Sequence, residues 1–145
     1  MKILTGQIGI VVGLAYLMTG CASWSTSDLG KAEYESKCVT CHGVSGKGDG
    51  PQAQFLPKSP ADLTRLALNN GGVFPVARVH EIIDGRLEVV AHGPRVMPVW
   101  GDDFMLRESG RPQDVSPEAF ANREAKVNAR IQAIVDYLSR LQVDK

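Results

Sequence analysis

The sequence feature that most constrains this chain is the run Cys38-Val39-Thr40-Cys41-His42. Two cysteines three positions apart at a helix end lie on one face, so both thiols can reach the two vinyl groups at one edge of a porphyrin. The next residue, a histidine, can then lie beneath the iron and supply a neutral imidazole nitrogen. The motif predicts one covalent haem c, attached at Cys38 and Cys41, with His42 as an axial iron ligand.

Two other uses of paired cysteines fit the sequence less well. A structural zinc site needs four Cys or His ligands, and the remaining histidines, His80 and His92, are separated and unpatterned. A dithiol redox site is typical of a thioredoxin-like strand–helix–strand setting, which the hydrophobic pattern does not indicate. Because the chain has only three cysteines, a disulfide framework is excluded as well.

The N-terminal residues have the pattern of an export signal. Lys2 precedes the uncharged run Ile8–Met18, which as a helix would reach about 16 Å and is too short for a bilayer core of about 30 Å. The sequence at residues 17–21, LMTGC, resembles the lipobox of bacterial lipoproteins. We therefore expect a lipoprotein signal peptide at 1–20, lipidation of Cys21, a tether at 21–27 and a single domain at 28–145.

The rest of the chain predicts a small all-α domain. Helices are expected at 28–38, 62–68 and 75–84, with a loop at 43–60 and an extended segment at 93–101. The last helix should begin at Ser116, as its N-cap, and Pro117. Its apolar stripe recurs at helical spacing, at Val127, Ile131, Ile134, Leu138 and Leu141. Residues 87–91 come nearest to a strand pattern.

Composition excludes two classes of protein and leaves one question open. A formal net charge of zero with 22% charged residues argues against a nucleic-acid binder and against intrinsic disorder. The same balance predicts partners that are not found mainly through charge. Aromatic residues are only 6% of the chain, which is few for a small core, and a buried haem would fill that space.

From about Leu29 to Gln142 the chain resembles a single-haem class I cytochrome c. Gly30 and Tyr34 precede the haem motif as in the N-terminal helix of that family, and Tyr137 resembles its partner on the C-terminal helix. The resemblance implies an N-terminal helix and a C-terminal helix that cross each other, with the covalent haem in the core.

The resemblance also implies a methionine as the second axial ligand. Met97 stands in the sequence MPVWG, similar to the segment that carries the ligand in many bacterial members, and the proline after it favours an extended loop. Met105 fits better as an apolar contact. Trp100 can donate its indole N–H to a haem propionate, or it can cover the core.

The family resemblance further implies a backbone carbonyl that orients the haem histidine. A proline carbonyl would accept a hydrogen bond from His42 and fix its ring. Pro51 is the first choice, with Pro57 and Pro60 as alternatives.

Histidine and methionine together fill both axial positions, so we expect a one-electron carrier and no enzyme. We expect a monomer that exchanges electrons with a donor and an acceptor protein, on the periplasmic side, lipid-anchored to the inner or outer membrane. Two alternatives remain open. One is an electron-entry subunit of a dehydrogenase or oxidase complex, and the other is a haem enzyme or sensor that lacks the Met97 ligand.

Overall fold

The computed structural model describes residues 26–86, 97–109 and 116–143. Within these ranges the chain is helical or irregular and contains no strand, which confirms the predicted all-α fold class. None of the helices in them is long and apolar enough to cross a bilayer. The elements are α1 (Thr26–Lys37), α2 (Val39–His42), α3 (Val76–Asp84), α4 (Trp100–Glu108) and α5 (Pro117–Arg140), with three 3-10 turns between α2 and α3.

The predicted signal peptide, Cys21 and the candidate strand at 87–91 lie outside the described residues. Of the predicted tether, Thr26 and Ser27 are described, and they form the first residues of α1. The helix therefore begins two residues earlier than expected.

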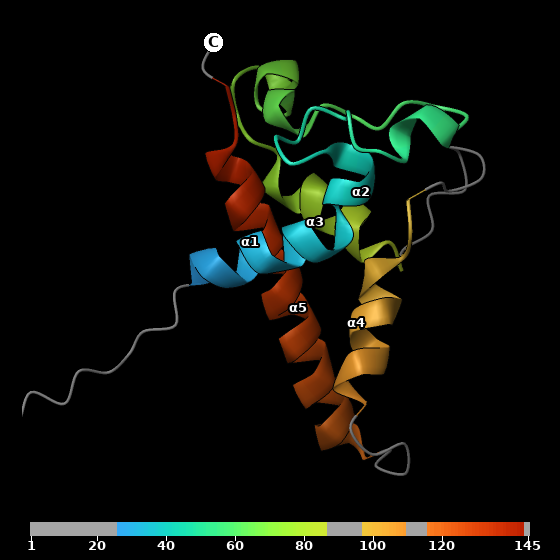
Figure 1. Cartoon of the computed structure of the whole chain (residues 1–145). Helices are drawn as coiled ribbons and strands as arrows, with labels where there is room; N and C mark the ends of the chain where they lie inside the picture. The colour runs from blue at the N-terminus through green and yellow to red at the C-terminus, as the bar shows by residue number, and fades with distance from the viewer. Residues whose placement is uncertain (1–25, 87–96, 110–115, 144–145) are drawn as a thin grey trace, which may run out of the picture.

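Helices α1 and α5 cross each other, as the resemblance implied (Figure 1). The crossing is close because Gly30 has no side chain, and a Cβ atom there would overlap the backbone carbonyl of Ala133 on α5. One turn further along α1, the ring of Tyr34 packs against that of Tyr137, with centroids 5.2 Å apart. The expected packing of Gly30, Tyr34 and Tyr137 is confirmed. These contacts fix the position of the C-terminal end of α1 relative to α5.

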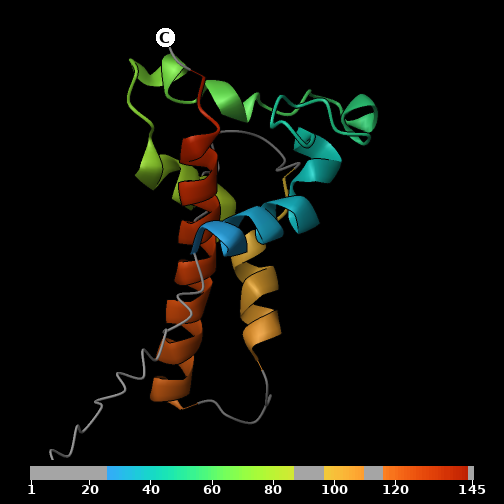
Figure 2. The ribbon, with the colours of Figure 1, turned by 60° about the vertical axis from the view of Figure 1, so that its left-hand side comes forward.

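Helix α5 begins where the sequence predicts. The Ser116 side chain accepts a hydrogen bond from the amide of Ala119 at 3.2 Å, and Pro117 occupies the first turn. The predicted stripe forms the centre of the core, with Val127, Ile131, Ile134 and Leu138 buried and Leu141 packed beside them. Figure 2 shows α4 running beside the first half of this long helix.

Helix α3 ends at Gly85, which has a φ of 70°, and this confirms the predicted C-cap. By contrast, α4 was not predicted, because residues 93–101 were expected to be extended and nothing was assigned after them. Gly101 has low helix propensity, and Val99, at the N-cap, offers no side-chain hydrogen bond to the first turn. The helix is held instead by tertiary packing, with Phe104 fully buried against the core.

The predicted helix at 62–68 is replaced by two separate 3-10 turns, Leu63–Arg65 and Leu68–Asn70. The carboxylate of Asp62 accepts hydrogen bonds from the amide and the hydroxyl of Thr64, at 2.9 and 2.6 Å. Such local bonds compete with helix formation. Gln142, just beyond α5, donates to the carbonyl of Leu63 at 2.8 Å, so this loop is attached to the C-terminal end of the chain.

Candidate haem-binding site

The haem motif forms a single turn directly after α1. Cys38 is the N-cap of α2, and its carbonyl accepts hydrogen bonds from the amides of Cys41 and His42 at 3.1 and 2.8 Å. Both thiols are free, with Cys38 buried and Cys41 half-buried. The structure therefore brings Cys38, Cys41 and His42 together on one short helix, as their spacing predicts.

A buried hydrogen bond fixes this turn to α1. The hydroxyl of Tyr34, which is fully buried, donates to the carbonyl of Gly43 at 2.6 Å. Gly43 ends α2 with a φ of 78°, a conformation that favours glycine. Burial raises the pKa of Tyr34, so its hydroxyl remains a donor. Sequence reasoning assigned Tyr34 to packing alone, and its bond to the haem motif is an additional role.

A carbonyl orients His42, but it is not the one predicted. The Nδ1 atom of His42 lies 3.1 Å from the carbonyl oxygen of Ala61. A carbonyl only accepts, so Nδ1 carries the proton and Nε2 keeps the lone pair that a metal needs. Burial lowers the pKa of His42 and favours this neutral form. Instead of bonding to His42, the carbonyl of Pro51 accepts a hydrogen bond from the side chain of Gln54.

The loop after the motif explains why Ala61 is the partner. Gly48 has a φ of 81°, and a Cβ atom there would overlap the carbonyl of Pro60. This close approach lays residues 60–61 against the turn that carries His42. No residue type marks a backbone carbonyl in a sequence, so only the proline preference of the resembled family pointed to this role.

The same loop completes the hydrogen bonding of the four-residue helix α2. The carbonyls of Thr40, Cys41 and His42 accept hydrogen bonds from the amides of Gln52, Gly50 and Gly48, at 2.9 to 3.1 Å. A helix this short has no internal partners for these carbonyls. The loop therefore supplies the hydrogen-bond donors that the carbonyls of α2 lack within the helix.

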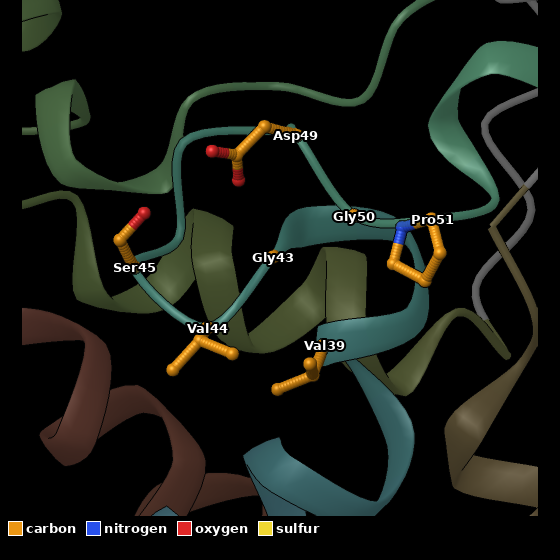
Figure 3. A pocket seen from close by; sticks show the side chains of 7 residues that line it. All are labelled: Val39, Gly43, Val44, Ser45, Asp49, Gly50 and Pro51. Atoms are coloured by element: carbon orange, nitrogen blue, oxygen red, sulfur yellow. The ribbon is translucent and has the colours of Figure 1, made fainter.

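A shallow hollow lies between α2 and this loop (Figure 3). The side chains of Val39 and Val44 stand on one side of it and the ring of Pro51 on another. None of Cys38, Cys41 and His42 lines it. The hollow is therefore a surface feature beside the haem motif.

The residues predicted for the second side of the haem lie at the entry to α4. Met97 and Trp100 are half-buried, and both pack against the core cluster. The ammonium group of Lys37, the last residue of α1, lies 5.0 Å from the centre of the Trp100 ring and 2.9 Å from a carboxylate oxygen of Asp103. This contact joins the start of α4 to the residue preceding Cys38, and sequence reasoning missed it.

Two of the three other candidates, Met105 and His80, lie in the described residues. Met105 packs against the core, which confirms its interpretation as an apolar contact. His80 is half-buried on α3, and His92 lies outside the described residues. In the described ranges no group of three or more His, Cys, Asp or Glu side chains is placed so that it could hold a metal ion.

The donor set fits a covalently attached haem. Two free thiols on one turn match thioether attachment, and an imidazole with Nδ1 engaged leaves Nε2 for iron. Cys38, Cys41 and His42 would hold the group.

Replacing Tyr34 with phenylalanine tests how the motif is held to α1. Tyr34→Phe keeps the ring but removes the buried hydroxyl donor, and the carbonyl of Gly43 then accepts only from the amide of Gly46. We therefore expect the free energy of unfolding of the haem-loaded protein to fall by about 1 kcal/mol. Denaturant unfolding measures it. Tyr137→Phe, which alters the other ring of the pair, serves as the control and should cost less than about 0.5 kcal/mol. Equal losses would show that the hydrogen bond has no special role.

The comparison with known families agrees with the motif and the helices. The profile of the family described as cytochrome C oxidase, cbb3-type, subunit III matches residues 26–109, which contain α1 to α4. No curated protein and no solved structure matches the chain. The matched part includes the whole haem motif and the Met97 segment. The chain therefore belongs to the cbb3-type cytochrome c oxidase subunit III family of c-type cytochromes.

Proposed function

We propose that this protein transfers single electrons through one haem c of the class I type, ligated by His42 and Met97. The hydrogen bond between Nδ1 of His42 and the carbonyl of Ala61 carries the proposal, because it leaves Nε2 of His42 available to bind iron, on the same turn as two cysteines that form no disulfide. Haem c, when bound, supplies a one-electron iron couple. The residues of the chain attach it, orient the imidazole and enclose it in an apolar core.

Met97 is the best second ligand among the described residues. Its side chain packs against the core cluster. The proline that follows, Pro98, disfavours an α-helical conformation at Met97. A thioether on the iron favours the reduced state, and burial disfavours the extra positive charge of the ferric state. With both axial positions filled, small molecules such as oxygen have no open position, and electron transfer remains.

Spectra of Met97→Ala test the ligand and the function together. We expect the wild-type ferric protein to show the far-red band of methionine ligation and its ferrous form not to bind carbon monoxide. Met97→Ala should lose the band, bind carbon monoxide, and have a lower reduction potential. Met105→Ala is the matched control and should keep all three wild-type properties.

The same spectra decide against the competing function. Rapid binding of carbon monoxide by the wild-type ferrous protein would contradict the carrier and favour a haem enzyme or sensor with an open iron position. An unchanged Met97→Ala spectrum would exclude Met97 as the ligand.

A second candidate function is that of a subunit within an oxidase complex. The family profile is named for a subunit of a cytochrome c oxidase, and it covers α1 to α4. The electron-entry role would use the same haem and the same ligands. Extraction of tagged protein from its native membrane in mild detergent separates the two. Recovery of a stoichiometric complex with haem–copper oxidase activity would favour the subunit, and recovery of the chain alone would favour a free monomeric carrier.

We further propose that the protein is exported and anchored by lipid at Cys21, on the periplasmic side of the inner or outer membrane. Haem attachment to this motif follows export, and the sequence at 17–21 has the lipobox pattern. A lipid anchor would confine the carrier to the membrane surface near its donor and acceptor. The balanced charge favours docking that depends little on salt.

Cys21→Ser tests the anchor. The wild-type protein should incorporate labelled fatty acid and sediment with membranes, whereas Cys21→Ser should carry no label, because the serine hydroxyl replaces the thiol that is lipidated. Haem content, measured by absorbance, is the control and should be unchanged, since Cys21 is outside the haem motif. Labelled Cys21→Ser protein, or an unlabelled wild type, would contradict lipidation at this residue.

A further inference from the structure

Arg86 occupies the position where the chain leaves α3. Its guanidinium donates to both carboxylate oxygens of Asp84, at 2.6 and 3.2 Å, and to both oxygens of Glu124 on α5, at 2.5 and 3.1 Å. Each pair is bidentate, the geometry in which arginine binds carboxylates most strongly. One guanidinium therefore joins the end of α3 to α5.

The chain returns to the same place at the start of α4. Gly101, in the first turn of α4, is buried so closely against this ion pair that a Cβ atom would overlap a carboxylate oxygen of Asp84 and lie 2.6 Å from Nε of Arg86. Arg86 and Gly101 thus lie together, although Met97 is between them in the sequence. The segment that carries Met97 begins and ends at one charged cluster.

This cluster is well suited to hold two segments together. The side chains of Arg86, Asp84 and Glu124 are only 24%, 16% and 27% exposed, so their attraction is less screened than that of surface pairs. The bonds to Asp84 and Glu124 raise the pKa of Arg86, so the charge persists at any ordinary pH. The carboxylate of Asp84 also lies at the N-terminal end of α4, where the helix dipole favours negative charge.

We propose that Arg86 is a positioning residue for Met97. By holding the two ends of the Met97 segment against each other and against α5, it reduces the conformational freedom that is lost when the thioether binds iron. The inference rests on the proposed ligation by Met97. It assigns to Arg86 no contact with the haem and no role in attaching it.

The test measures how easily Met97 is displaced in the haem-loaded protein. In Arg86→Gln we expect carbon monoxide to compete about tenfold better with the methionine on ferrous iron than in the wild type, an energy of about 1.4 kcal/mol. The far-red ferric band should also disappear at a denaturant concentration below that of global unfolding. Attachment at Cys38 and Cys41 should be complete, as measured by the covalent mass.

Arg130 provides a matched control. It too is an arginine between two carboxylates, those of Glu33 and Glu108, with a side chain 32% exposed, but it joins α5 to α1 and to the far end of α4. Arg130→Gln should lower the free energy of unfolding while leaving the competition with carbon monoxide within about twofold of the wild type. Glu124→Gln is a milder change that tests the same cluster if Arg86→Gln folds poorly. It should also make carbon monoxide compete better with the methionine than in the wild type.

The outcomes separate the two proposals. If Arg86→Gln and Glu124→Gln leave the competition unchanged, or if Arg130→Gln raises it equally, then Arg86 has only a general structural role and the inference is wrong. If the wild type itself lacks the far-red band, the ligation by Met97 is wrong, and the role of Arg86 is refuted with it.

Discussion

The close crossing of α1 and α5 is the constraint on which the rest of this structure depends. It exists because Gly30 lets one backbone lie directly against the carbonyl of Ala133. The packing of Tyr34 on Tyr137 then fixes the rotation of α1. The residue after α1 is Cys38, so the position and direction of the haem motif follow from this contact. A looser crossing would displace the motif as a unit and leave its internal geometry intact.

Around the motif, side chains are oriented mainly by backbone carbonyls. Tyr34 donates to the carbonyl of Gly43, and the imidazole of His42 lies against that of Ala61. Both carbonyls are set by glycines with positive φ in the loop, Gly43 itself and Gly48. This arrangement explains how a loop with few buried side chains orients the imidazole of His42. At the start of α4 the contacts are made by charged side chains instead. Lys37 pairs with Asp103, and Gly101 lies against Arg86.

The fold could be predicted, and Cys38, Cys41 and His42 could be named as candidates for haem attachment, because these signals are local or carried by side-chain identity. The spacing of Cys38, Cys41 and His42 defines the cofactor, and Ser116 followed by proline and an apolar stripe defines α5. The partner of His42 could not be predicted, because every residue has a backbone carbonyl. Only the folded conformation of the loop after the haem motif shows that the carbonyl of Ala61 lies beside the imidazole. Helix α4 was missed for a related reason. It is stabilised by the burial of Phe104 against the core, and helix propensity and capping residues, which can be read from the sequence, contribute little.

Helix α1 also acts as a rigid spacer. Its 12 residues span about 18 Å from Thr26 to Lys37. The point at which anything N-terminal joins the domain, a lipid-bearing segment or another protein, therefore lies about one helix length away from Cys38. A longer connection before Thr26 would widen the reach of the domain, whereas a longer α1 would disturb the crossing at Gly30.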